Sequence, residues 1–481
     1  MGQDCISEIY FEKDRILRGI VSGKGMVYRE ILSICRDHDI FSRGLIQTRE
    51  LDQSVAYGRQ YSMILEHERI PFISYPHEWS SEMLKAAALL QIDLDLALRE
   101  YGYALKDSHP WNVLFYYDKP VFVDFSSIIP VREFKEQDWL GSFSRNWVRK
   151  IWSCLKLPSK YFYENYRRMF RPYFLLPLYL MNLRNQRKAR HLLFARTLNT
   201  TDQTIRPGEV FGMFFPFFLS WEFFKALRLL RGQQGEMQFL KALRKEISSL
   251  KASRFKSRYT PYYDQKGENF DVDQPGPWKE KQRSVQEILT HYKPRTVLDV
   301  ACNTGWFALL AARLGCDVVA FDIDEECVNL LFERIRGKHM RILPLVIDFL
   351  HPTPDVYAWP NPGEGQDPVL FALEKRLQCD LVLALGIVHH LCLGEGKPFG
   401  AILEPLNKLS LKTLVIEFIP PEDSLIQKER SFFKAYQKAP HSFGWYTLEN
   451  LKSEIRKYFL DAEEKPSHPE GRKLLVCHKN R

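Results

Sequence analysis

The sequence predicts an α/β protein whose C-terminal part, residues 251–481, forms a doubly wound sheet of seven strands. Apolar strand segments alternate with helical segments from about residue 296 onward, which is typical of such a sheet. Two closing strands, 459–465 and 473–479, are joined by the turn-forming segment SHPEGR. A closing hairpin adds an antiparallel last strand to strands that otherwise run parallel.

The elements of this C-terminal domain follow in a regular order. Strands are expected at 296–301, 317–322, 340–348, 380–385 and 413–418, and helices at 306–314, 325–336, 399–409 and 447–458. A chain of 481 residues is too long for one ordinary core, so further domains are expected. Residues 1–145 predict an α+β domain, and residues 146–250 predict a mainly helical region that is unusually aromatic.

Composition and charge set limits on partners and compartment. A net charge of +9, from 68 basic and 59 acidic residues, permits an anionic partner without arguing for one. Nucleic acid is not expected, because no binding module accompanies the basic segment 184–190. A membrane-surface contact by the aromatic segments 161–182 and 209–230 is a less favoured alternative to core packing. The sequence leaves the oligomeric state open.

The nine cysteines form no CxxC pair and no group with zinc spacing, and the N-terminus is too polar for a secretory signal. We therefore expect no disulfide framework, no metal and a cytoplasmic protein.

The segment LDVACNTG (298–305) lies where the first strand turns into the first helix. Small residues in such a turn let the backbone pass close to a ligand, and the free N–H groups of the helix start can face it. Asp299 stands at the end of the first strand, and Asp322 ends the second. A carboxylate at the latter position can accept both hydroxyls of an adenosine ribose.

This segment resembles the first motif of class I S-adenosylmethionine (SAM)-dependent methyltransferases, acidic-x-Gly-x-Gly-x-Gly, on a Rossmann-like sheet. Gly305 is the one motif glycine present, and Ala301 and Asn303 replace the other two. We expect Ala301 to cost little, and Asn303 to be tolerated because Asn enters left-handed conformations readily. The absence of GxGxxG disfavours an NAD enzyme. A sheet that binds another nucleotide, or none, remains the alternative.

The resemblance implies SAM as the cofactor. Asp299 would receive its amino group, directly or through water, and Asp322 would hold its ribose. Asp348, which ends the third strand, and Phe349 would contact the edge and face of the adenine. The remaining expected cofactor residues are Ala301, Asn303, Gly305, Ile323 and Leu385.

Two segments follow strands four and five at the carboxyl edge of the sheet, LGIVHHLCLG (385–394) and EFIPPED (417–423). Methyl transfer depends mainly on positioning an in-line nucleophile. A hydroxyl nucleophile would also need a base, and histidine fits that role. His389 and His390 are therefore candidates, and Glu417 could orient or deprotonate the acceptor. For each histidine a purely structural role is the alternative.

A closer resemblance rests on four longer segments. They are similar to a bacterial methyltransferase family that includes the NoeA nodulation proteins, from roughly residue 55 onward: LEHERIPFISYPHEWS (65–80), LKDSHPWNVLF (105–115), LVLALGIVHHL (381–391) and EFIPPEDSLIQ (417–427). The resemblance implies a SAM-dependent transferase with a poorly defined acceptor. A role in nodulation does not follow from it.

The segment LKDSHPWNVLFYYDKPVFVDF (105–125) places Asp107, Asn112 and Asp124 in an order that resembles protein kinases and small-molecule phosphotransferases. There, a base Asp and a metal-binding Asn precede a hairpin that ends in a metal-binding Asp. A helix at 80–101 precedes the motif. Lys106 and Ser126 depart from the kinase pattern, and no lysine–glutamate pair or phosphate loop is evident. We favour a degenerate kinase-like module that binds a ligand, with a wholly structural motif as the alternative.

The sequence as a whole predicts a SAM-dependent methyltransferase. Its acceptor would be a small molecule, a glycan or a lipid-linked molecule, selected with help from the upstream domains. One alternative is a non-catalytic scaffold that joins a pseudokinase-like module to a degenerate methyltransferase fold. Another is a methyltransferase that acts on RNA or protein.

Overall fold

The computed structural model describes most of the chain in two compact units. Unit 1 comprises residues 1–253 except 72–74 and 78–80, and unit 2 comprises those six residues with 254–481. The described residues are 7–131 (without 13, 22, 54 and 57), 162, 165–197, 232–251, 257, 259–260, 272–273, 276, 278–357, 370–428 and 433–479. The expected boundary near residue 145 lies outside them, so the division of the first 250 residues stays a prediction.

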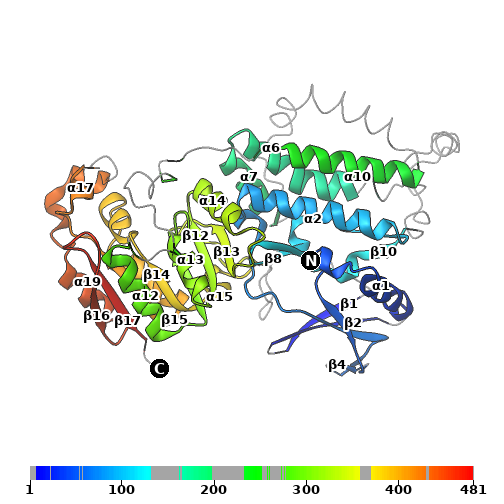
Figure 1. Ribbon diagram of the computed structural model, residues 1–481, viewed down its shortest axis with the longest axis horizontal. Coiled ribbons are helices and arrows are strands. Elements are labelled where there is room, and N and C mark those ends of the chain that lie inside the picture. The colour runs from blue at the N-terminus through cyan, green and yellow to red at the C-terminus, as the bar shows by residue number, and fades with distance from the viewer. Residues whose placement is uncertain are drawn as a thin grey trace. The chain divides into compact units, whose positions relative to one another are not determined.

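Unit 2 contains a seven-stranded sheet in the order β13-β12-β11-β14-β15-β17-β16 (Figure 1). Its strands are β11 (Thr296–Val300), β12 (Asp317–Asp322), β13 (Ile342–Val346), β14 (Cys379–Ala384), β15 (Ser410–Phe418), β16 (Ala462–Pro466) and β17 (Lys473–His478). In this order, the five strands β13, β12, β11, β14 and β15 pair in parallel. Strand β17 is antiparallel to both β15 and β16. The predicted sheet with an antiparallel last strand is confirmed. The last strand lies between β15 and β16 and leaves β16 at the edge.

Helices pack onto this sheet because each presents an apolar stripe to it. The main ones are α12 (Glu280–Tyr292), α13 (Trp306–Arg313), α14 (Glu325–Ile335), α16 (Phe399–Leu409) and α19 (Leu448–Ile455). Buried residues of α12, α13 and α14 join alternate residues of the strands in one core cluster. The Asp324 side chain caps α14 by accepting from the N–H groups of Glu326 and Cys327. Shorter helices are α15 (Leu373–Arg376), α17 (Ser424–Lys428) and α18 (Lys434–Lys438).

Unit 1 begins with a four-stranded antiparallel sheet in the order β1-β2-β6-β3. Its strands are β1 (Ser7–Glu12), β2 (Arg15–Ile20), β3 (Thr48–Leu51) and β6 (Met63–His67). Helix α1 (Gly25–Asp37) lies between β2 and β3 in the chain. A short hairpin, β4 (Val55–Ala56) and β5 (Arg59–Gln60), precedes β6.

The motif region of unit 1 follows α2 (Ser81–Arg99), at the position of the expected helix. The strands are β7 (Tyr103–Leu105), β8 (Val113–Tyr116), β9 (Lys119–Phe122) and β10 (Ile128–Pro130). β8 and β9 form the predicted hairpin, and β10 returns to pair with β7. This pairing brings the segments on either side of the hairpin together. The kinase-like character of the domain stays a prediction.

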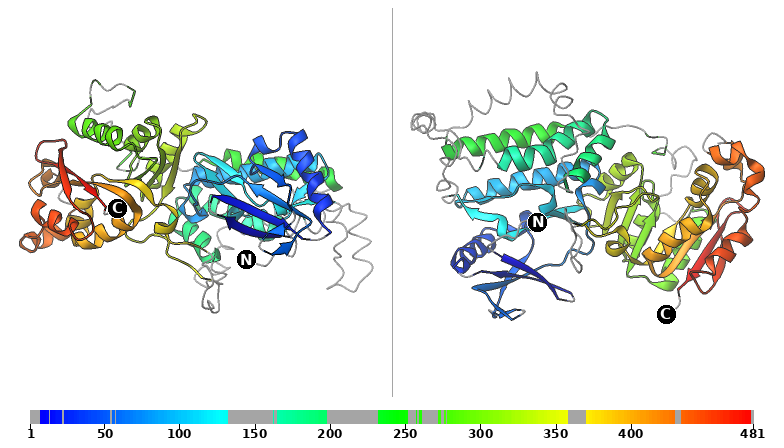
Figure 2. Two further views of the ribbon diagram at one scale, coloured as in Figure 1. Left: turned by 90° about the horizontal axis from the view of Figure 1, so that it is seen from below. Right: turned by 180° about the vertical axis from the view of Figure 1, so that it is seen from behind.

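The described middle of the chain is helical. It contains a π-helix (Tyr166–Leu175), α6 (Leu176–Asn182), α7 (Gln186–Thr197) and α10 (Gly232–Ser249). Figure 2 shows α10 running beside α2, where Arg99 of α2 pairs with Glu236 of α10 at 2.6 Å in a buried position. The aromatic segment 209–230 lies outside the described residues. In the described part of the chain, no helix combines the length and apolarity needed to cross a bilayer.

Candidate functional site

The turn after β11 uses three left-handed residues in close succession. Ala301 has φ 58°, Asn303 has φ 52° and Gly305 has φ 79°. A Cβ atom at Gly305 would lie 2.5 Å from Leu331 Cδ1, so both the backbone angle and the packing require glycine. The left-handed region costs an alanine about 1–2 kcal/mol, so Ala301 is more strained than the sequence suggested. Asn303 fits, as predicted, because its side chain tolerates this conformation.

Asn303 also ties the turn to its neighbours. Its backbone N–H donates to Asp322 Oδ2 at 2.8 Å, and its side-chain Nδ2 donates to the Tyr259 carbonyl at 3.3 Å. Its Oδ1 accepts from the Thr304 N–H. These bonds hold the turn against the end of β12. The two bonds of the Asn303 side chain would not form with glycine at this position, whereas the backbone bond to Asp322 would.

Asp299 is a buried carboxylate, and one of its oxygens accepts no hydrogen bond from the described residues. The residue is 2% exposed, and burial raises the pKa of its carboxyl to about 7, partly opposed by the N–H of Ala308. Its Oδ2 is buried and has no hydrogen-bond partner among the described residues. Leaving such an acceptor without a donor costs about 1–3 kcal/mol, so the position is suited to a ligand that supplies a donor.

Asp322 ends β12 beside the same turn. Burial raises the pKa of its carboxyl to about 6, opposed by the backbone N–H groups of Asp324 and Asn303. Its Oδ1 accepts from the Asp324 N–H at 2.9 Å, so the side chain is fixed in one orientation. Carboxylate oxygens have further lone pairs, which leaves capacity for ligand hydroxyls.

One cavity of about 600 Å³ collects the predicted site residues of unit 2. This volume lies in the usual range for small-molecule sites. Every predicted cofactor residue except Gly305 lines it, namely Asp299, Ala301, Asn303, Asp322, Ile323, Asp348, Phe349 and Leu385. His389, His390 and Glu417 line it as well. Asp348 is partly held by its neighbours, because Oδ1 accepts from the Leu350 N–H and Oδ2 lies 2.9 Å from His351 Nδ1.

The two histidines follow β14 at the start of a helical segment, a π-helix over His390–Gly394 that the sequence did not predict. Their rings are 4.2 Å apart, and the His390 ring stacks on Phe433 at 5.5 Å. Burial lowers the pKa of His390 to about 4, so the ring is neutral at pH 7. A base works best with a pKa near the working pH, which favours a positioning role for His390 over proton removal.

Glu417 is fully buried near the end of β15 and is already engaged. Its Oε2 accepts from Lys281 Nζ at 2.6 Å, and its Oε1 accepts from Ser467 Oγ at 2.6 Å. This pairing supports orientation rather than proton removal. Lys281 was missed in the sequence because it lies on α12, with no motif around it, 136 residues from its partner.

Other lining residues were also missed. Tyr259 lies before the sheet and Arg472 near its end, and both line the cavity. Arg472 is held by two hydrogen bonds to Asp423, at 2.8 and 2.9 Å, in a buried position. The segment EFIPPED (417–423) is thus fixed to the turn before β17. Among the described residues, no group of three or more His, Cys, Asp or Glu side chains could hold a metal ion.

The remaining predicted residues lie in unit 1. Asn112 Nδ2 donates to the Asp107 carbonyl at 3.0 Å, and Asp124 Oδ1 lies 3.1 Å from Arg18 Nη1. Arg18 is a further residue that the sequence did not identify, because β2 precedes the motif by more than 80 residues.

Comparison with known proteins yields a relative that matches most of the chain. No protein-family model matches the chain. The nodulation protein NoeA of Rhizobium meliloti (strain 1021) is 27% identical over 440 residues, which cover 89% of this chain and 85% of NoeA.

Solved structures give weaker alignments. Magnesium protoporphyrin IX methyltransferase of Synechocystis PCC 6803, with bound SAH, is 13% identical over 50% of this chain and 95% of its own, with a TM-score of 0.28. The N-methyltransferase NodS of Bradyrhizobium japonicum WM9 is 12% identical over 42% of this chain and 97% of its own, also with a TM-score of 0.28. At these TM-scores the fold assignment rests on the strand order of unit 2. The chain is similar to NoeA over most of its length, and its C-terminal unit is a seven-stranded Rossmann-like sheet in which β17 runs antiparallel.

Proposed function

We propose that unit 2 is a SAM-dependent methyltransferase. The observation that carries this proposal is the open, buried Oδ2 of Asp299, which lines one cavity with Asp322 beside the left-handed turn at 301–305. A buried carboxylate without a donor suits an ammonium group, and a second carboxylate at the end of the next strand suits ribose hydroxyls. The residues present thus fit the amino acid and ribose parts of SAM.

The other predicted cofactor residues suit the adenine ring of SAM. Phe349 is mostly buried, and Ile323 is 66% exposed although it is apolar. An adenine ring lying against these side chains would cover the exposed apolar surface. Asp348 at the same end offers carboxylate oxygens to the adenine edge. Bound SAM supplies an electrophilic methyl group on a sulfonium.

The residues at the other end of the cavity would position the acceptor. The His389 and His390 rings can form hydrogen bonds with it or pack against it, and the Lys281–Glu417 pair forms a fixed polar part of the cavity wall. We infer an acceptor that does not depend on a strong base, since His390 has a low pKa and Glu417 is already paired. A small molecule, a glycan or a lipid-linked molecule is favoured, with unit 1 assisting its selection.

A second candidate function is a non-catalytic scaffold. The lack of an evident base at the reaction end, together with the strained Ala301, favours this alternative. It allows SAM to bind without any transfer. A methyltransferase acting on RNA or protein differs from the first proposal in the acceptor alone, and fractionation of a labelled product would distinguish the two.

Calorimetric titration with SAM tests the site. Asp322→Ala removes the acceptor for two ribose hydroxyls, and the loss of charged hydrogen bonds should weaken binding by about 100-fold. Asp317→Asn is the matched control, because Asp317 lies at the opposite end of β12 and pairs with Arg341. The control should bind SAM like the wild type. Equal affinities for wild type and Asp322→Ala would contradict the assigned site.

A further inference from the structure

The side chain of Asn303 links the turn after β11 to a segment that precedes the sheet. Its Nδ2 donates to the Tyr259 carbonyl at 3.3 Å, 44 residues earlier in the chain. Its Oδ1 accepts from the Thr304 N–H at 2.6 Å, so the turn itself orients the amide. The amide is therefore fixed by the turn at its oxygen and holds the Tyr259 backbone with its nitrogen.

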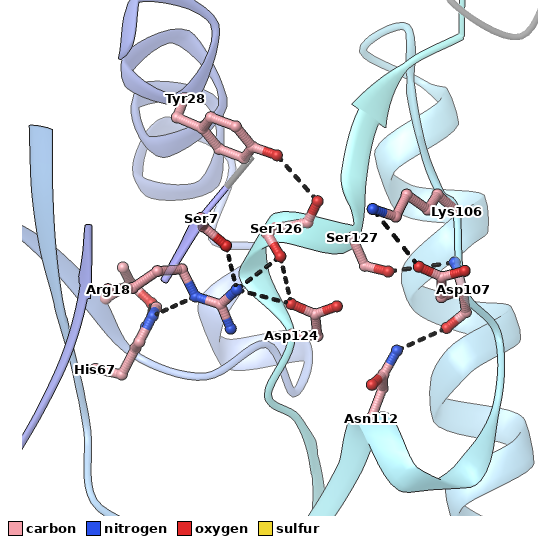
Figure 3. A network of polar contacts seen from close by, with 11 residues as sticks. Ser7, Arg18, Tyr28, His67, Lys106, Asp107, Asn112, Asp124, Ser126 and Ser127 are labelled. Atoms are coloured by element: carbon pink, nitrogen blue, oxygen red, sulfur yellow. Dashed lines mark hydrogen bonds and ion pairs between the residues drawn. The ribbon is translucent and has the colours of Figure 1, made fainter. Parts of the chain in front are cut away.

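Two other asparagine amides bridge much shorter spans. In unit 1, Asn112 donates to the Asp107 carbonyl at 3.0 Å, five residues away, as Figure 3 shows. In unit 2, Asn450 donates to the Trp445 carbonyl at 2.9 Å, also five residues away. Such bonds stabilise a local loop. The bond of Asn303 instead joins two separate segments, and a motif glycine at this position would not form it.

Tyr259 belongs to a turn that is compact on its own. The N–H groups of Tyr259 and Thr260 both donate to Ser257 Oγ at 3.2 Å. The Thr260 hydroxyl donates to the Ser257 carbonyl at 2.9 Å. These local bonds fix the shape of the turn, and Asn303 fastens the turn to the cofactor side of the cavity.

The Tyr259 ring also contacts the reaction end of the cavity. Tyr259, Asn303 and His390 all line the cavity. The Tyr259 and His390 rings meet edge to face, with centroids 6.5 Å apart and planes at 87°, a favourable arrangement for aromatic pairs. On the other side, the Asn303 N–H donates to Asp322, the expected ribose ligand, at 2.8 Å. Tyr259 is thus linked to the ribose side through Asn303 and to the reaction end through His390.

We propose that Asn303 is a positioning residue that holds the Tyr259 ring against bound SAM and so slows the release of SAM. The proposal rests on the assignment of the cavity to SAM. Release requires the ring to move away, and both the Asn303 bond and the His390 contact oppose that movement. The asparagine therefore has a function that the motif glycine lacks.

The test measures the release of methyl-labelled SAM from the full chain, without an acceptor, after a chase with excess S-adenosylhomocysteine. Asn303→Gly keeps the backbone bond to Asp322 and adopts the φ of 52° freely, but it removes the link to Tyr259. Release should become about fivefold faster, the effect of one neutral hydrogen bond. Unchanged or slower release with the motif glycine would overturn the proposal.

A second variant separates the ring from a general loosening of the turn. Tyr259→Ala removes the ring but keeps the carbonyl that accepts from Asn303, and it should release SAM at least as fast as Asn303→Gly. In the double variant, Asn303→Gly should add little, because the ring on which Asn303 acts is gone. Two effects that multiply in full would show that glycine acts by loosening the turn, and they would contradict a role through Tyr259.

Two further variants serve as controls. Asn450→Gly removes an amide-to-carbonyl bond of the same kind at a residue that does not line the cavity, and it should release SAM like the wild type. Tyr259→Phe keeps the ring and should also retain slow release. Release from Tyr259→Phe as fast as from Tyr259→Ala would rule out the ring as the retaining group. Thermal unfolding verifies that each variant is folded.

Failure of this inference differs from failure of the proposed function. If labelled SAM does not bind to the wild type, the proposed function and this inference both fail. If SAM binds and leaves the wild type and Asn303→Gly at the same rate, only the role of Asn303 fails and the cofactor site stands. Equal acceleration in Asn303→Gly and Asn450→Gly would likewise overturn the role of Asn303 alone.

Discussion

Asp299 in unit 2 and Arg18 in unit 1 are both buried ionisable groups, and their surroundings differ. In unit 2, Asp299 is buried with an oxygen that lacks a donor, and its pKa is raised to about 7. In unit 1, the buried guanidinium of Arg18 is held by four residues and pairs with Asp124. An uncompensated charge lowers the stability of the empty protein and is compensated when a ligand binds. A paired charge stabilises the fold and leaves only its remaining donors for a ligand.

This contrast predicts its largest effect for the stability of unit 1. Arg18→Ala removes one partner of a buried pair and leaves its acceptors without a donor, which should cost about 3 kcal/mol. Arg15→Ala is the matched control on the same strand, because Arg15 is 45% exposed and pairs with Glu66 at the surface. A surface pair contributes at most about 1 kcal/mol. Amide hydrogen exchange in β2 and β6 measures both, and equal losses would contradict the contrast.

In unit 2, by contrast, Asp299→Asn should raise the stability of the ligand-free protein. The carboxyl binds its proton more tightly in the folded protein than at its usual pKa of 3.8, so its contribution to stability falls as pH rises from about 4 to 7. The neutral amide should therefore stabilise the empty protein above pH 7, by about 2 kcal/mol. Thermal unfolding from pH 5 to 8 measures this. A variant that is less stable than wild type at pH 8 would contradict the account.

The affinity for SAM should rise with pH, whereas the contribution of Asp299 to stability falls. The ammonium of SAM favours ionised Asp299, so affinity should rise about 10-fold between pH 6 and 8 and then level off, given a pKa of about 7. Asp299→Asn should bind about 30-fold more weakly at pH 8 and show a flatter profile. Asp322, with a pKa of about 6, adds a further decrease at lower pH. An affinity independent of pH in the wild type would exclude Asp299 from the site.

The smallest effect is expected at Ala301. Ala301→Gly relieves a left-handed alanine at φ 58° but adds freedom to the unfolded chain, so the net gain should be at most about 1 kcal/mol. Chemical denaturation of the variant and the wild type compares them. A clear loss of stability would mean that the methyl group of Ala301 contributes packing that outweighs the strain.

The sequence predicted unit 2 better than unit 1 for a physical reason. Each parallel strand of unit 2 is a short apolar run followed by a helix, and strand ends such as Asp299 and Asp322 meet at one edge of the sheet by topology alone. Local pattern and spacing therefore identified Asp299 and Asp322, which both line the cavity at this edge. The strain at Ala301 was not predictable, because it depends on the path of the turn.

The residues that escaped prediction depend on distant partners. Lys281 reaches Glu417 across 136 residues, and Arg18 reaches Ser126 across 108. Neither has a distinctive neighbourhood in the sequence, so only the folded chain reveals the pairs. The hairpin that presents Asp124 was predictable, because its two apolar strands are adjacent in the chain.

The most direct test of the central claim is transfer of label from methyl-labelled SAM into fractions of a cell extract. The account predicts a labelled small-molecule, glycan or lipid fraction with the wild type and with Asp317→Asn, and strongly reduced label with Asp322→Ala. Label in RNA or protein would assign a macromolecular acceptor. Tight SAM binding without label in any fraction would contradict methyl transfer and favour the scaffold.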